Sequence, residues 1–287
     1  MKPSRVIVRV LMAWVALLVA RMIAGAIIPI KVSMPGNLLI WAATANFLTA
    51  AALAFAGMRS DWRGWRLGLA LCAIPLAIDL IDSIEGIVYL KIPGLDWQRI
   101  LLQFIVAYAL LVPLWTLIFG KNSDAVQANY SPLRSRSLGQ KLWRFIVSDF
   151  AYLFLYLIAG MIIFPFVKSF YATQTLPSLG ELVSLQLFLR GPLFVSICLL
   201  LVRMMGLPRA AGALAVGTVF AIVSGVAPLM VPNPFFPDSV RWVHFCEVTG
   251  SNFLFATLVG WMWGVPKSVT SWSMNANELD GRQKMSS

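Results

Sequence analysis

Three acidic residues follow one another at intervals of three in an otherwise apolar stretch of the sequence: Asp79, Asp82 and Glu85. If this stretch is helical, successive steps of three rotate by about −60°, so the carboxylates lie within about 120° on one helix face. Carboxylates gathered in this way can bind a cation, hold a proton or pair with basic side chains. They are the strongest local indication of function in the sequence.

Four further ionisable residues inside apolar stretches are candidate ligand- or proton-binding partners for these acids: Arg21, Arg190, His244 and Glu247. At 1.5 Å per residue, the candidates fall in the outer half of the stretches that contain them. We expect Arg21 to pair with Asp79 or Asp82. We expect Arg190 to pair with Glu247.

The intramembrane charges do not balance, because four carboxylates face only two guanidinium groups. Buried negative charge in excess is costly, so some carboxylates are protonated or a cation or cationic ligand occupies the site. Either possibility suits a small-solute or ion transporter with an acidic site open to the external face. The alternative is a non-catalytic membrane assembly or regulatory protein, in which the ion pairs only fix helix packing.

A membrane-embedded enzyme is the third hypothesis, because His244, Glu247 and Ser251 share one helix face. A zinc protease needs several His or carboxylate ligands, and the chain has one histidine. The motifs of intramembrane proteases and of nucleotide-binding loops are missing from the sequence. The sequence therefore favours no catalytic residue, no metal site and no cofactor, and we interpret His244 as a hydrogen-bonding partner of Glu247.

The composition indicates which solvent surrounds these residues. Hydrophobic residues make up 59% of the 287 residues and charged residues only 12%, with a mean hydropathy of +0.80. A soluble domain has about 25% charged residues, and this chain would expose large apolar patches in water. The lipid bilayer is therefore the expected partner of most of its surface.

Eight apolar stretches are long enough, at about 20 residues, to cross the hydrocarbon core as helices. They are Val8–Ile30, Leu38–Met58, Leu67–Leu90, Ile100–Phe119, Phe145–Val167, Leu179–Val202, Ala210–Val231 and Val243–Trp263. The first could be a cleaved signal peptide, but Arg21 interrupts its apolar core and favours an uncleaved anchor. The predicted fold is an all-α, polytopic membrane helix bundle.

The distribution of basic residues predicts the orientation. With the N-terminus inside, sixteen of the 23 Lys and Arg residues fall in cytoplasmic segments, as the positive-inside rule requires. Both termini are then cytoplasmic. The net charge of +11 is explained by this bias, so no nucleic-acid partner is expected. Short loops and the basic bias suit a bacterial cytoplasmic (inner) membrane.

The longest hydrophilic connection suggests how the chain is organised. The basic cytoplasmic loop 121–144 joins two four-helix halves, 1–120 and 145–264, within one transmembrane bundle. Similar short basic turns after the second and sixth spans hint at a duplicated four-helix unit. The polar segment 265–287 is expected to be a disordered cytoplasmic tail.

Overall fold

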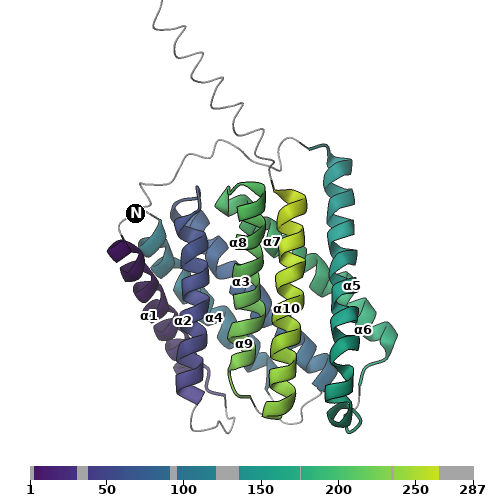
Figure 1. Cartoon of the computed structure of the whole chain (residues 1–287). Helices are drawn as coiled ribbons and strands as arrows, with labels where there is room; N and C mark the ends of the chain where they lie inside the picture. Colours follow the sequence, from purple (N-terminus) through teal and green to yellow (C-terminus); the bar gives the residue numbers. More distant parts are fainter. Residues whose placement is uncertain are drawn as a thin grey trace, which may run out of the picture.

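The computed structural model of the protein describes residues 3–30, 38–90, 96–120, 136–174, 176–233 and 236–264. Within these ranges every secondary-structure element is a helix (Figure 1). The elements are α1 (Pro3–Ile27), α2 (Leu38–Met58), α3 (Gly64–Glu85), η1 (Gly86–Leu90), α4 (Trp97–Phe119), α5 (Leu138–Tyr171), α6 (Leu179–Leu185), η2 (Gln186–Arg190), α7 (Gly191–Met205), α8 (Arg209–Ala221), η3 (Ile222–Val226), α9 (Ala227–Met230) and α10 (Asp238–Trp263). The predicted all-α fold class is confirmed.

Seven helical segments in the described part of the chain are long and apolar enough to cross a membrane: Pro3–Ile27, Leu38–Met58, Gly64–Val88, Trp97–Phe119, Leu138–Tyr171, Leu179–Met205 and Arg209–Met230. The chain is therefore a multi-pass integral membrane protein. The eighth predicted span corresponds to α10, which has 26 residues but carries polar and charged side chains over its first half. Figure 1 shows the start of α1 and the end of α10 at the same end of the bundle, as an even number of crossings requires. We call this the inner end and the opposite one the outer end.

The largest difference from the predicted boundaries is at α5, which begins at Leu138 and not at Phe145. Ser137 is its N-cap and accepts a hydrogen bond from the backbone N–H of Gln140 at 3.3 Å. Water can satisfy the polar first turns of a helix beyond the membrane, so hydropathy alone places the start too late. Residues 121–135 of the predicted loop and the predicted tail 265–287 lie outside the described residues.

Spans three and four cross at a glycine, and so do spans seven and eight. A Cβ added to Gly68 of α3 would overlap the hydroxyl of Thr116 and lie 2.9 Å from a backbone carbonyl oxygen of α4. A Cβ added to Gly217 of α8 would overlap the hydroxyl of Thr257 and lie 3.0 Å from a carbonyl oxygen of α10. Small residues allow membrane helices to approach this closely. The same contact thus occurs once in each predicted half.

A tryptophan on the last span of each predicted half donates a hydrogen bond to the first span of that half. Trp115 Nε1 donates to the backbone oxygen of Ala13 at 3.2 Å, joining α4 to α1. Trp263 Nε1 donates to Ser148 Oγ at 3.3 Å, joining α10 to α5. The two halves therefore share a second internal contact.

The two predicted halves meet mainly through α2, which packs against η3 and α9. On the other side of the interface, α3 and η2 make few close backbone contacts. Long polar side chains join these two elements toward the outer end. The interface is thus closely packed on one side and polar on the other.

Three arginines bind the end of α10 at the inner end of the bundle. Arg209 donates to the backbone oxygen of Trp261 at 2.7 Å, and Arg136 donates to that of Trp263 at 3.2 Å. Arg144 donates to the backbone oxygen of Met262. The last carbonyls of a helix lack partners within it and carry partial negative charge. The guanidinium groups supply both the missing donors and the opposite charge.

Candidate functional site

The carboxylate of Asp79 lies in a three-residue cluster. It accepts a hydrogen bond from Arg21 Nη2 at 2.9 Å and one from the hydroxyl of Tyr108 at 2.7 Å. Arg21 also donates to that hydroxyl at 2.8 Å. These side chains come from α3, α1 and α4, so the cluster ties three spans of the first half together. The predicted pairing of Arg21 with Asp79 or Asp82 is confirmed for Asp79.

The other two acids of α3 hold Arg190 of η2. Nη2 of Arg190 lies 3.2 Å from Asp82 Oδ1, and Nη1 forms a salt bridge with Glu85 Oε2. The guanidinium carbon also lies 4.8 Å from the ring centroid of Phe194. Because only 9% of the Arg190 side chain is exposed, this charge depends on its two carboxylates for stabilisation.

Gln186 extends this cluster to α5. Its Nε2 donates to Glu85 Oε1 at 2.8 Å, and its Oε1 accepts from the hydroxyl of Tyr152 at 3.0 Å. Gln186 and Tyr152 are both buried. A continuous hydrogen-bonded network therefore runs from α3 through η2 to α5.

The predicted pair between Arg190 and Glu247 is wrong. Glu247 Oε2 instead bonds to Nδ1 of His244 at 2.7 Å on the same helix, so the interpretation of His244 as its hydrogen-bonding partner is confirmed. Arg190 is the last residue of a π-helical segment, and the extra residue of a π turn changes the direction of the side chains that follow. Its guanidinium consequently bonds to α3.

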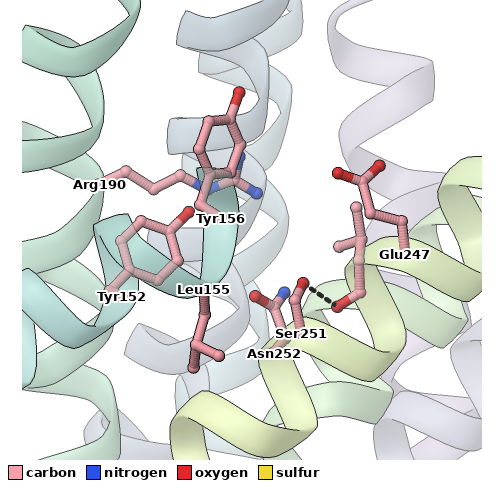
Figure 2. Close-up of a pocket in the computed structure, with 8 residues that line it drawn as sticks. Tyr152, Leu155, Tyr156, Arg190, Glu247, Ser251 and Asn252 are labelled. Atoms are coloured by element: carbon pink, nitrogen blue, oxygen red, sulfur yellow. Dashed lines mark hydrogen bonds between the residues drawn. The ribbon is translucent and has the colours of Figure 1, made fainter. Parts of the chain in front are cut away.

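A small pocket lies between α5, η2 and α10 (Figure 2). Its volume of about 20 Å³ is sufficient for a water molecule. Figure 2 shows Arg190 and Glu247 on opposite sides of it. The lining residues are Tyr152, Leu155, Tyr156, Arg190, Glu247, Val248, Ser251 and Asn252. Two of the sequence candidates, which do not pair directly, therefore face one small pocket with both polar and apolar lining residues.

The three π-helical segments all adjoin polar contacts. Glu85 directly precedes η1, and η2 contains Gln186 and Arg190. The third segment, η3, contains Ser224, whose hydroxyl accepts from Asn252 Nδ2 at 2.9 Å. Single π turns within α-helices occur frequently at functional sites. Their position supports the choice of this region as the candidate site.

The sequence does not single out Asp149 of α5, which the structure buries. Its Oδ1 atom has no hydrogen-bond partner within the described residues. A Cβ added to Gly191 would overlap this oxygen, so the glycine makes room for the carboxylate. Asp149 falls close to the predicted start of its span, where an acidic side chain is expected to lie in the membrane–water interface. The tyrosines Tyr108 and Tyr152 were also missed, because tyrosine in an apolar stretch carries no specific signal.

The acids of α3 do not converge on one point. Asp79 pairs with Arg21, whereas Asp82 and Glu85 pair with Arg190. Among the residues that the structure describes, no group of three or more His, Cys, Asp or Glu side chains could hold a metal ion. The acidic helix face is thus divided between two ion-pair clusters.

Comparison of the protein with family models, with curated proteins and with solved structures found no match. Its function is therefore inferred from the contacts of its own residues.

Proposed function

We propose that this protein is a transporter that moves a small solute or ion across a bacterial cytoplasmic membrane, linked to a proton or another small cation. The observation that carries the proposal is the environment of Arg190, a buried guanidinium on a π-helical segment held by two carboxylates of another span. Ionisable groups inside membrane proteins are costly and mark ion and substrate pathways or proton relays.

The balance of embedded charge supports the link to a cation. The buried and half-buried side chains of the spans include three guanidinium groups and five carboxylates: Arg21, Arg190 and Arg241, and Asp79, Asp82, Glu85, Asp149 and Glu247. Full ionisation of these groups would leave two negative charges in excess in a medium of low dielectric constant, which is costly. Protons on some carboxylates, or a bound cation, remove this excess. Either equilibrium can be coupled to solute movement.

The location of the network also supports transport. The outer part of α3 and η2 are joined by ion pairs and not by close backbone packing. The glycine and tryptophan contacts that recur in both halves support an internal repeat. Many transporters place their sites between structural repeats, beside interrupted helices. The network around Arg190 has the same setting.

The alternative is a membrane assembly or regulatory protein whose ion pairs are structural. It is favoured by the pairing of all four predicted acids, each of which has a basic partner within 3.2 Å. Buried pairs of this kind can determine which helices pack together. In this alternative the pocket holds only structural water.

Cation entry into sealed lipid vesicles containing the purified protein separates the two functions. With an imposed membrane potential, dyes inside the vesicles report proton, Na⁺ and K⁺ entry, and we expect entry of one of these cations. Asp82→Asn should abolish it while the protein remains folded, because Glu85 still pairs with Arg190. The control is Asp96→Asn, the same substitution at an exposed acid whose partner is also exposed. No flux in the wild type, together with misfolding of Asp82→Asn, would favour the structural alternative.

A further inference from the structure

A hydrogen-bonded chain of three side chains runs from the outer end of α5 to the pocket. Tyr171 is the last residue of α5, and its hydroxyl lies 2.8 Å from Nε2 of His244. Nδ1 of His244 lies 2.7 Å from Glu247 Oε2. An ionised carboxylate only accepts, so Nδ1 donates to Glu247, and in a neutral imidazole Nε2 then accepts from the tyrosine. One neutral tautomer of the histidine therefore satisfies both bonds.

Aromatic rings enclose the histidine. The ring centroids of Tyr171 and Phe236 lie 5.9 and 5.3 Å from that of His244. The side chains of His244 and Glu247 are only 14% and 8% exposed. Hydrogen bonds in such an enclosed place are strengthened by the low local dielectric constant. The three side chains are thus largely shielded from solvent between their two ends.

Beyond Glu247, the chain reaches the pocket and Arg190. The Nε atom of Arg190 is buried and has no hydrogen-bond partner among the described residues. A buried donor without an acceptor is costly, and the pocket has room for one water molecule. A water here can accept from Arg190 and donate to Glu247, which face each other across the pocket (Figure 2).

We propose that Tyr171, His244 and Glu247 form the path by which protons from the external side reach the pocket beside Arg190. The proposal rests on the proposed transport function in one respect: these protons are the ones linked to transport. The charged and titratable groups of neighbouring elements that face the pocket at the end of the path are Tyr152 and Tyr156 of α5 and Arg190 of η2. Arginine stays protonated in proteins, so the path ends at Glu247 and the pocket water.

One transfer balances without any other reactant. An external hydronium ion gives a proton to the Tyr171 hydroxyl and becomes water, and the hydroxyl passes its own proton to Nε2 of His244. The ring then releases the Nδ1 proton to Glu247, which becomes a neutral carboxylic acid, and the imidazole is again neutral. Once Glu247 has passed its proton to the pocket water, rotation of the ring restores the starting tautomer.

Infrared spectroscopy of sealed vesicles with the outer end of the protein facing outwards tests this path. When the external buffer is made acidic, the wild type should show a carboxylic-acid C=O band that is lost in Glu247→Gln. His244→Gln and Tyr171→Phe should keep the band but form it at least tenfold more slowly. Asp96→Asn, at an exposed acid directly before α4 whose partner is also exposed, should leave the band and its rate unchanged.

Several outcomes would overturn the path. They are the absence of the band in the wild type, its survival in Glu247→Gln, and wild-type rates in the two slowed variants. Tyr171→Phe removes one hydroxyl at a helix end, so it decides the question if His244→Gln does not fold. If the infrared bands are as expected but the wild type shows no cation flux, transport is refuted and the path is retained. If cation flux is unchanged by Glu247→Gln, the path alone is refuted.

Discussion

Glu85 and Arg190 stand 105 positions apart in the sequence and form a salt bridge between the third and the sixth spans. No local element brings them together, since each belongs to a helix that is complete without the other. The bridge can form only when the third and the sixth spans have packed together in the bundle. Its contribution to stability therefore measures their association.

Replacing Arg190 with Met should destabilise the protein by about 3–5 kcal/mol, because Asp82 and Glu85 then lose their counter-charge in a buried place. Adding Glu85→Gln should recover part of the loss. Denaturant unfolding in mixed micelles of the single and double variants measures the coupling, and additive effects would show that the residues do not interact. Arg203→Met, which removes a contact over Trp62, is the control and should cost about 1 kcal/mol or less.

Arg21 should couple to Asp79 and not to Asp82. Its side chain is 36% exposed, so we expect Arg21→Ala to cost about 1–3 kcal/mol, less than loss of a fully buried partner. Asp79→Asn should recover part of this loss, because it removes the carboxylate left without a partner. Asp82→Asn should give no such recovery. It should lower the free energy of unfolding in the Arg21→Ala variant by as much as it does in the wild type. Equal recovery by the two Asn substitutions in unfolding experiments would contradict this assignment.

Gly217→Ala should destabilise the protein by about 1–3 kcal/mol, because the new methyl group overlaps the Thr257 hydroxyl and approaches the backbone of α10. Adding Thr257→Ala should recover only part of the loss, since the contact with the backbone remains. Thermal unfolding provides the measurement. Gly250→Ala is the matched control, because a Cβ there meets nothing within 4 Å. Equal melting temperatures of Gly217→Ala and the control would show that the close crossing is not required.

A reporter that is active only in the cytoplasm should be active after Lys121 and after Gly206, and inactive after Gln174. The basis is the excess of basic residues on the predicted inner side. A fusion after Ser287 should also be active, because an even number of spans returns the chain to its starting side. An inactive fusion at Ser287 would contradict both the number of spans and their orientation.

The sequence predicts the helices well because the bilayer imposes a minimum length and an apolar composition on each span. It also identifies the acids of α3 as members of the polar network, since ionisable groups in apolar stretches are rare. The sequence offers Asp79 or Asp82 as the partner of Arg21, and the structure pairs Arg21 with Asp79. These successes all depend on properties of single helices.

The partner of Arg190 could not be predicted, because it depends on the relative placement of two spans. The π turn that directs Arg190 toward Glu85 has no recognisable signature in the sequence. Asp149 was missed for a related reason: its burial depends on the space left by Gly191, a residue on another span. Hydropathy thus predicts neither the order of the helices in the bundle nor the rotation of each helix about its own axis.

The arginines that bind the end of α10 also determine the point about which helices of the bundle could tilt. Arg136 and Arg144, near the start of α5, and Arg209, at the start of α8, clamp these helices to α10 at one end. At the opposite ends, the hydroxyl of Tyr171 on α5 lies 2.8 Å from Nε2 of His244 on α10, and Arg241 of α10 donates to two backbone carbonyl oxygens of α9. A helix as long as α5 spans about 50 Å, so a tilt of about 5° at the clamp displaces its far end by about 4 Å. Tyr152 and Tyr156 line the pocket about halfway along α5. The same tilt therefore moves them by about 2 Å, a distance comparable with the size of a water molecule.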